Sequence, residues 1–114
     1  MRPPAPQVDD PAGLRTEGAI ECTLCRAVIT HQDQALAINN RHAHAFFNPA
    51  GIAFELRLFR QAPGVSPHGE PSAEFTWFPG YHWQIVLCTA CHCHLGWRFI
   101  ADQSFFGLIA NRLQ

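Results

Sequence analysis

Two pairs of cysteines, each with two residues between its members, constrain the fold of this 114-residue chain more than any other feature. The first pair is Cys22 and Cys25, and the second is Cys88 and Cys91. Each pair can present two thiolates to one tetrahedral ion, and four thiolates are a usual ligand set for structural zinc. We therefore predict one structural Zn²⁺ held by these four cysteines, with no coordination position left open for catalysis.

The long separation between the two pairs does not forbid a shared metal. About sixty residues lie between them, and closing a loop of that length costs only about 3–4 kcal/mol. Structural zinc contributes on the order of 10 kcal/mol or more, so most of the domain can lie between the pairs. Two alternatives stay open: a ligand set that uses Cys93 or a neighbouring histidine, and four unpaired core thiols.

Length, charge and the N-terminal sequence narrow the class of protein. A chain of this length predicts one domain, and its net charge of −1 offers no field that would attract nucleic acid or an anionic membrane. The Pro- and Gly-rich start predicts a poorly ordered tail over residues 1–18, with the domain at 19–114. It contains no apolar run of the length of a signal peptide or spanning helix. We therefore expect a cytoplasmic protein, whose paired cysteines bind metal in a reducing environment.

Strand signals dominate the rest of the chain and predict an all-β fold of mainly antiparallel strands. Residues 42–47 and 52–59 are expected to form a hairpin, with alternate apolar residues of the second run on one face. Residues 61–72 are expected to be a loop, because they are rich in Pro and Gly. Short strands are predicted at 75–78, 81–88 and 95–100, whereas 105–113 fits a strand or one or two helical turns.

All three tryptophans lie near the second cysteine pair in the sequence, two of them in the segment EFTWFPGYHW, residues 74–83. Trp97 and Phe99 are two apart in a predicted strand and therefore point to the same side. A tight turn at residues 79 and 80 would send Trp77 and Trp83 to opposite faces, whereas a three-residue loop centred on Gly80 would let them face each other. The residues alone leave open whether the cluster is core packing or a pocket for a cation or a flat neutral ring.

Five segments in a fixed order resemble the thalidomide-binding (CULT) domain of cereblon, and single-domain bacterial homologues in particular. They are CTLC, HAHAFFNPAG, FTWFPGYHW, CTACHCHLGWRF and FFGL, and the match runs from about residue 19 to about residue 113. The resemblance implies a β-tent fold, in which two antiparallel sheets are set at a steep angle and pinned near a four-cysteine zinc site. It also implies that the four paired cysteines are the zinc ligands.

The resemblance further implies a ligand site whose polar end is mostly backbone. The Phe75 carbonyl would accept from an imide N–H, and the Trp77 N–H would donate to an imide carbonyl. The implied ligands are glutarimides such as thalidomide, other cyclic imides, uracil-like rings, and peptides with a C-terminal cyclic imide. The ligand-binding residues expected on this basis are Trp77, Trp83, Trp97, Phe99, Phe75, Thr76 and Asn48.

Three further functions fit the residues less well than binding without turnover. Methionine sulfoxide reductases of the B type share the tent-like fold and zinc pairs, but they need a catalytic thiolate near the C-terminus, and no cysteine follows Cys93. A nucleic-acid-binding zinc module would need a basic stripe, which the sequence lacks. Imide hydrolysis would need a nucleophile and base around the pocket, and His82 alone is not such a set. We therefore expect no enzyme activity, and no ubiquitin-ligase role, because the adaptor-binding region of full-length cereblon has no counterpart here.

Overall fold

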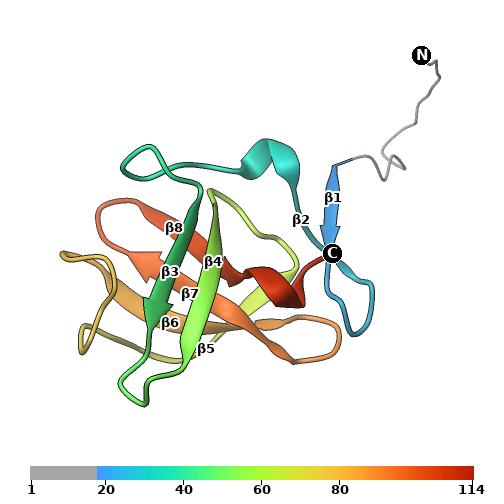
Figure 1. Ribbon diagram of the computed structural model, residues 1–114. Coiled ribbons are helices and arrows are strands. Elements are labelled where there is room, and N and C mark those ends of the chain that lie inside the picture. Colours follow the sequence, from blue (N-terminus) through green and yellow to red (C-terminus); the bar gives the residue numbers. More distant parts are fainter. Residues whose placement is uncertain (1–17) are drawn as a thin grey trace.

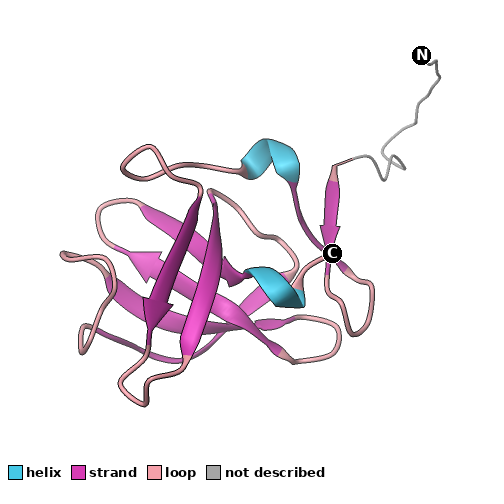
Figure 2. Cartoon of the chain, viewed as in Figure 1, coloured by secondary structure: helices cyan, strands magenta, loops and turns pink. Residues whose placement is uncertain are grey.

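The computed structural model describes residues 18–114, which fold into eight β-strands and two short 3₁₀ turns (Figure 1, Figure 2). The predicted tail over residues 1–18 lies, except for Gly18, outside the described residues. The elements in chain order are β1 (Ala19–Glu21), β2 (Val28–His31), η1 (Gln32–Gln34), β3 (Ala43–Phe47), β4 (Ala53–Phe59), β5 (Val65–Ser72), β6 (His82–Cys88), β7 (His94–Ile100), β8 (Ser104–Ile109) and η2 (Ala110–Arg112).

The strands form two antiparallel sheets, so the prediction of an all-β fold with two such sheets is confirmed. Strands β1 and β2 make a two-stranded ribbon, and the other six strands pair in the order β3-β4-β8-β7-β6-β5. The larger sheet is strongly twisted, and β3 and β4 cross the direction of β6 and β7 in Figure 1. This twist leaves the tip of the β3–β4 hairpin beside one face of β6 and β7.

The predicted hairpin over residues 42–59 is confirmed, with β3 and β4 joined by the turn at residues 48–51. The Gly51 N–H donates to the Asn48 carbonyl at 2.9 Å, and the Ile52 N–H donates to Asn48 Oδ1 at 2.9 Å. Gly51 has a φ of 85°, a left-handed conformation that glycine adopts without a steric penalty. The expected alternation holds from Glu55 to Leu58, because Leu56 and Leu58 are buried while Glu55 and Arg57 are exposed on the opposite face, and it ends at Phe59, which is also buried.

Two sequence predictions were wrong for reasons that lie outside the local sequence. Residues 61–72 were expected to be a loop, but 65–72 form β5. This strand pairs only with β6, and an edge strand tolerates Pro67 because one side of its backbone needs no partner. Residues 75–78 were expected to be a strand, but they belong to a loop in which Phe75 has a φ of 57°, outside the range of regular strand backbone for a residue with a side chain. The C-terminal segment, left open between strand and helix, forms β8 followed by the turn η2.

The core consists of two neighbouring clusters. One packs around Cys22 and Cys88 and includes Ile29, Phe59 and Leu95, all at most 1% exposed. The other is rich in aromatic rings, and its buried members are Leu56, Leu58, Phe78, Phe99, Phe105 and Ile109. The first cluster therefore surrounds the cysteines, whereas the second lies beneath the tryptophans.

Gly96 brings the backbones of β7 and β8 close together, so it offers a stability test of the fold. A Cβ at Gly96 would overlap the carbonyl oxygen of Gly107 and lie 2.9 Å from the Cα of Leu108. We expect Gly96→Ala to lower the free energy of unfolding by about 3 kcal/mol, because backbone atoms cannot move aside. The control is Gly80→Ala, where φ is 91° and no atom lies within 4 Å of the new Cβ, so only about 1–2 kcal/mol of conformational strain is added. Urea denaturation that gives equal losses for both variants would contradict this packing.

Candidate metal centre and ligand pocket

The four paired cysteines come together at one point. Their Sγ atoms all lie within 4.8 Å of one another, with 3.7 Å between those of Cys22 and Cys91 and 3.6 Å between those of Cys25 and Cys88. A tetrahedral ion with sulfur ligands at about 2.3 Å requires sulfur–sulfur distances of about 3.8 Å. The donor set therefore fits one metal ion, as the sequence predicted for these four residues.

Both cysteine pairs lie on the same kind of turn. The residue after each pair, Arg26 or His92, is left-handed, with φ values of 68° and 66°. The N–H of Arg26 donates to the Cys22 carbonyl at 2.9 Å, and that of His92 donates to the Cys88 carbonyl at 2.8 Å. These bonds close each turn and hold the two sulfurs of a pair on the same side of the chain.

The thiols of the cluster differ in acidity. Burial raises the pKa of Cys22, but the N–H groups of Cys25 and Leu24 and the thiols of Cys93 and Cys91 outweigh it and lower that pKa to about 6. For Cys91 the Cys93 N–H favours the thiolate, yet burial and the thiols of Cys93 and Cys22 raise the pKa to about 11. Without a cation the cluster therefore holds fewer thiolates than a metal needs, and metal binding must release protons.

A cavity of about 440 Å³ lies against one face of β6 and β7. Trp83 stands directly across from Phe99 in the two strands, and Ile85 stands across from Trp97, so these four side chains share that face. The β3–β4 hairpin and the loop at residues 73–81 complete the cavity. Its lining residues are Asn48, Pro49, Phe54, Glu74, Phe75, Trp77, Trp83, Ile85, His94, Trp97 and Phe99.

The loop at residues 73–81 is anchored by Phe78. This side chain is 7% exposed, and its ring meets those of Phe99 and Phe105 edge-on at 4.8 and 5.1 Å. The Tyr81 N–H donates to the Phe78 carbonyl at 3.0 Å, and Gly80 has the positive φ that a turn centred on residues 79 and 80 requires. The tight turn is therefore present, but it does not join two strands, so it does not force Trp77 and Trp83 to opposite faces.

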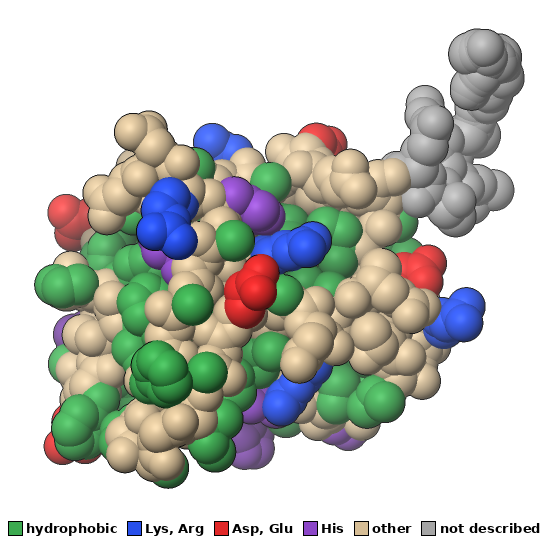
Figure 3. Space-filling model, in the orientation of Figure 1, with side chains coloured by type: hydrophobic (Ala, Val, Ile, Leu, Met, Phe, Trp, Pro, Cys, Tyr) green, Lys and Arg blue, Asp and Glu red, His purple; other side chains and the backbone are tan. Residues whose placement is uncertain are grey.

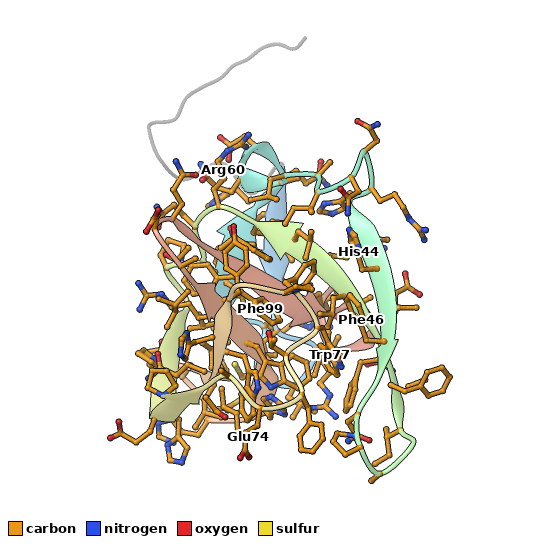
Figure 4. The ribbon with its side chains drawn as sticks, turned by 90° about the vertical axis from the view of Figure 1, so that its left-hand side faces the viewer. His44, Phe46, Arg60, Glu74, Trp77 and Phe99 are labelled. Carbon is orange, nitrogen blue, oxygen red and sulfur yellow. The ribbon has the colours of Figure 1, made fainter. Side chains whose placement is uncertain are left out.

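Trp77 is held at the cavity by the β3 strand. Its ring stacks on that of Phe46 at 5.0 Å with 4° between the planes, and its Nε1–H donates to the Phe47 carbonyl at 3.0 Å (Figure 4). It also meets Trp97 edge-on at 4.9 Å. Neither of these two indoles is buried. They touch at an edge and still leave the cavity open, so they do not close on each other as core filler.

The other end of the loop is held by Trp83, whose Nε1–H donates to the Glu74 carbonyl at 2.7 Å. The next residue, Phe75, is left-handed and 74% exposed. Within residues 18–114, the Phe75 carbonyl and the Trp77 N–H make no hydrogen bond to another residue. A free acceptor and a free donor are thus present in a loop that lines a mostly apolar cavity.

Six of the seven residues expected to bind ligand line the cavity, and Thr76 does not. The Thr76 hydroxyl instead donates to the Phe78 carbonyl at 3.3 Å. Phe99 is only 1% exposed, so it is a buried base of the cavity as well as a wall.

Sequence reasoning missed several lining residues. Phe54 lies on the apolar face of its strand and Ile85 lies two residues after Trp83, so period-two spacing could have found both. His94 could not be found in this way. A shift of register between Val86 and Leu87 changes which β7 residues face the cavity.

The surface of the described residues carries both charged and apolar side chains outside the cavity. On the face drawn in Figure 3, acidic and basic side chains are scattered, and apolar side chains gather at the lower left. Three exposed apolar side chains are Phe47, Ile52 and Phe75, at 70%, 54% and 74% exposure. No helix within residues 18–114 has the length and apolar character needed to cross a membrane.

Comparison with known proteins places these features in one family of sequences. No protein-family model matches the chain. Curated relatives called protein cereblon do match, at 33% identity over 112 residues in Drosophila grimshawi, 34% over 112 in Drosophila willistoni and 35% over 109 in Drosophila erecta. These matches cover 89%, 89% and 86% of this chain but only 16%, 18% and 18% of the relatives, so the chain spans about a sixth of their length. The resemblance seen in the sequence is therefore confirmed, and this chain is a homologue of one part of cereblon, over a stretch consistent with its CULT domain.

Proposed function

We propose that the chain is a zinc-stabilised module that binds a small cyclic imide or a uracil-like ring without turning it over. The imide can be a glutarimide, a thalidomide-type ligand or the C-terminal cyclic imide of a protein. The observation that carries the proposal is the 440 Å³ cavity bordered by Trp77, Trp83 and Trp97. The three indoles are only partly buried where they pack against the aromatic core cluster, and the Nε1–H groups of Trp77 and Trp83 are bonded to backbone carbonyls, so the ring surface that borders the cavity can contact a ligand.

The chemistry of a cyclic imide matches the two kinds of surface at this cavity. Its aliphatic or flat ring atoms are neutral and suit the indole faces. Its carbonyl–NH–carbonyl edge can donate to the free Phe75 carbonyl and accept from the free Trp77 N–H. A closed pocket that left either group unpaired would lose about 1–3 kcal/mol, so a ring that satisfies both is favoured over one that does not.

The left-handed backbone of Phe75 also supports this role. A non-glycine residue with a φ of 57° is strained, and such strain persists where the surrounding contacts hold it. Here the Trp83–Glu74 bond on one side and the Phe78 anchor on the other hold the loop. We therefore assign recognition to the Phe75 backbone, and expect little from its exposed ring.

For the metal we propose one structural Zn²⁺ on the four paired cysteines. Four thiolates at tetrahedral spacing match zinc, and a closed shell leaves no position for a substrate. All five cysteines are free of disulfide bonds, which supports our placement of the protein in the reducing cytoplasm.

Two features of the cavity argue for binding without catalysis. No cysteine is among its lining residues, and Cys93 instead lies 3.6 Å from the Cys22 sulfur, which disfavours reductase chemistry. The histidine that lines it, His94, has its Nε2 bonded to the Gly96 carbonyl at 2.9 Å, and burial lowers its pKa. Neither residue forms a nucleophile and base pair at the cavity.

Titration calorimetry with three small rings tests the proposed ligand class. Glutarimide and uracil are expected to bind saturably at one site, whereas N-methylglutarimide should bind at least about tenfold more weakly, a difference of about 1.4 kcal/mol, because it has no N–H for the Phe75 carbonyl. Since the rings are neutral, affinity should not change between low and high salt. Failure of glutarimide to bind, or equal binding of the N-methyl ring, would contradict the proposal. Binding of tetramethylammonium in place of glutarimide would show a cation cage instead.

A further inference from the structure

The fifth cysteine, Cys93, lies against the metal centre without belonging to its ligand set. Its Sγ is 3.6 Å from that of Cys22, and the Cys91 Sγ is 3.7 Å from the same atom. The group of sulfurs that all lie within 4.8 Å of one another nevertheless contains Cys91 and not Cys93. The thiols of Cys93 and Cys91 thus lie at nearly the same distance from the buried Cys22 sulfur, and only Cys91 belongs to the four-sulfur group.

The turn that carries Cys93 does not need a thiol at that position. In the first turn, the Cys22 N–H donates to the Ala27 carbonyl at 2.9 Å, and in the second, the Cys88 N–H donates to the Cys93 carbonyl at 2.8 Å. Cys93 therefore occupies the place that Ala27 occupies in the matching turn. Because Ala27 makes the corresponding backbone hydrogen bond in the first turn, this bond does not require a thiol at residue 93.

The position of Cys93 decides which ligand it could replace. Its thiol lies 3.6 Å from that of Cys22, and Cys91 is two residues before it in the same turn, whereas the Cys25 sulfur lies 3.6 Å from that of Cys88. Cys91 is the exposed member of its pair, and Cys22 and Cys88 are buried. The ligand in the turn of Cys93 that solvent can reach is therefore Cys91.

We propose that Cys93 is a reserve ligand of the metal centre, which takes the place of Cys91 when the Cys91 sulfur leaves the metal or is absent. In the exchange a bond from the metal to the Cys93 sulfur would form as the bond to Cys91 breaks, and the Cys93 proton would pass to the departing Cys91 thiolate. In a chain without the Cys91 sulfur, that proton would pass to water. No oxidant or reductant is needed. The distance from the Cys93 sulfur to that of Cys22, 3.6 Å, is close to the tetrahedral spacing of about 3.8 Å, so the exchange can keep that edge of the tetrahedron. The inference rests on the metal centre of the proposed function and is independent of the ligand pocket.

Cobalt(II) is a suitable probe, because tetrahedral thiolate sites absorb through sulfur-to-cobalt charge transfer. We expect Cys91→Ser to bind one Co²⁺ with the four-sulfur spectrum of the parent and an affinity within about tenfold of it. The matched variant Cys25→Ser has no spare thiol beside it, and should bind at least about 100-fold more weakly. Cys91→Ser/Cys93→Ala should weaken binding as much as Cys25→Ser does. Four thiols of Cys91→Ser should be protected from alkylation by the bound ion.

Each outcome decides a separate claim. A parent protein that binds no Co²⁺ refutes the metal centre itself. If the parent binds, but Cys91→Ser fails to bind or matches Cys91→Ser/Cys93→Ala, the reserve role is wrong. Cys93→Ala makes the second turn match the first and should keep the four-sulfur spectrum. Loss of that spectrum in Cys93→Ala would make Cys93 a ligand of the parent and would also overturn the inference.

Discussion

Replacing Trp83 by alanine should weaken glutarimide binding by at least about 30-fold, which corresponds to about 2 kcal/mol. The substitution removes one indole face from the cavity and also the bond to the Glu74 carbonyl that holds the loop beside Phe75. Both changes act on the bound ring, one through contact area and one through the position of the backbone groups. Trp83→Phe keeps an aromatic face without the N–H, and its affinity should fall between those of the alanine variant and the parent. Titration calorimetry measures all three.

The matched control for Trp83→Ala is Phe75→Ala. The Phe75 side chain also lines the cavity, but it is 74% exposed, and the proposed contact is its backbone carbonyl. We expect its affinity for glutarimide to stay within about threefold of the parent, a change of less than about 0.7 kcal/mol. Circular dichroism must show the same fold in both variants. Equal losses of affinity in the two variants, or unchanged affinity in Trp83→Ala, would contradict the proposal that the indoles bind the ring.

Removing the metal with a chelator should unfold the domain. Structural zinc contributes on the order of 10 kcal/mol or more to folding, and a domain of this kind has a total stability of about 5–15 kcal/mol. The cysteines Cys22 and Cys88 are themselves part of the core cluster around Ile29 and Leu95, so loss of the ion would remove a cross-link from inside that cluster. We expect loss of the β-sheet signal in circular dichroism, and one zinc per chain by metal analysis before chelation.

Two cysteine variants separate loss of metal from loss of a thiol. Cys88→Ser removes a buried ligand and should give a protein that does not fold at any practical zinc concentration. Cys93→Ala removes a thiol that is not in the ligand set, and should keep one zinc per chain and a cooperative unfolding transition. A stable fold that survives complete removal of the metal would show that hydrophobic packing alone holds these sheets.

Features set by neighbouring residues could be predicted from the sequence. The β3–β4 hairpin follows from alternation on both sides of the Asn48–Gly51 turn, and that turn is closed by bonds among its own residues. The four-cysteine site follows from spacing within each pair, because each turn is closed by a bond between residues four apart. Local chemistry decides both features, so local sequence was sufficient.

Features set by distant contacts could not be predicted. Strand β5 exists because β6 offers it a partner at the edge of the sheet, where Pro67 is tolerated. The loop that carries Trp77 is held by Phe47, thirty residues earlier in the chain, and by the burial of Phe78 against β7 and β8. Because these contacts keep residues 75–78 out of a strand, they also decide that Trp77 and Trp83 border one cavity. The identity of the ligand stays a prediction.

The crystal structure of the protein grown with glutarimide would test the central claim most directly. We predict electron density for the ring among Trp77, Trp83 and Trp97, with its N–H within about 3 Å of the Phe75 carbonyl oxygen and one of its carbonyls at a similar distance from the Trp77 N–H. Indoles packed face to face with no ring between them, or glutarimide bound at another surface, would contradict the account.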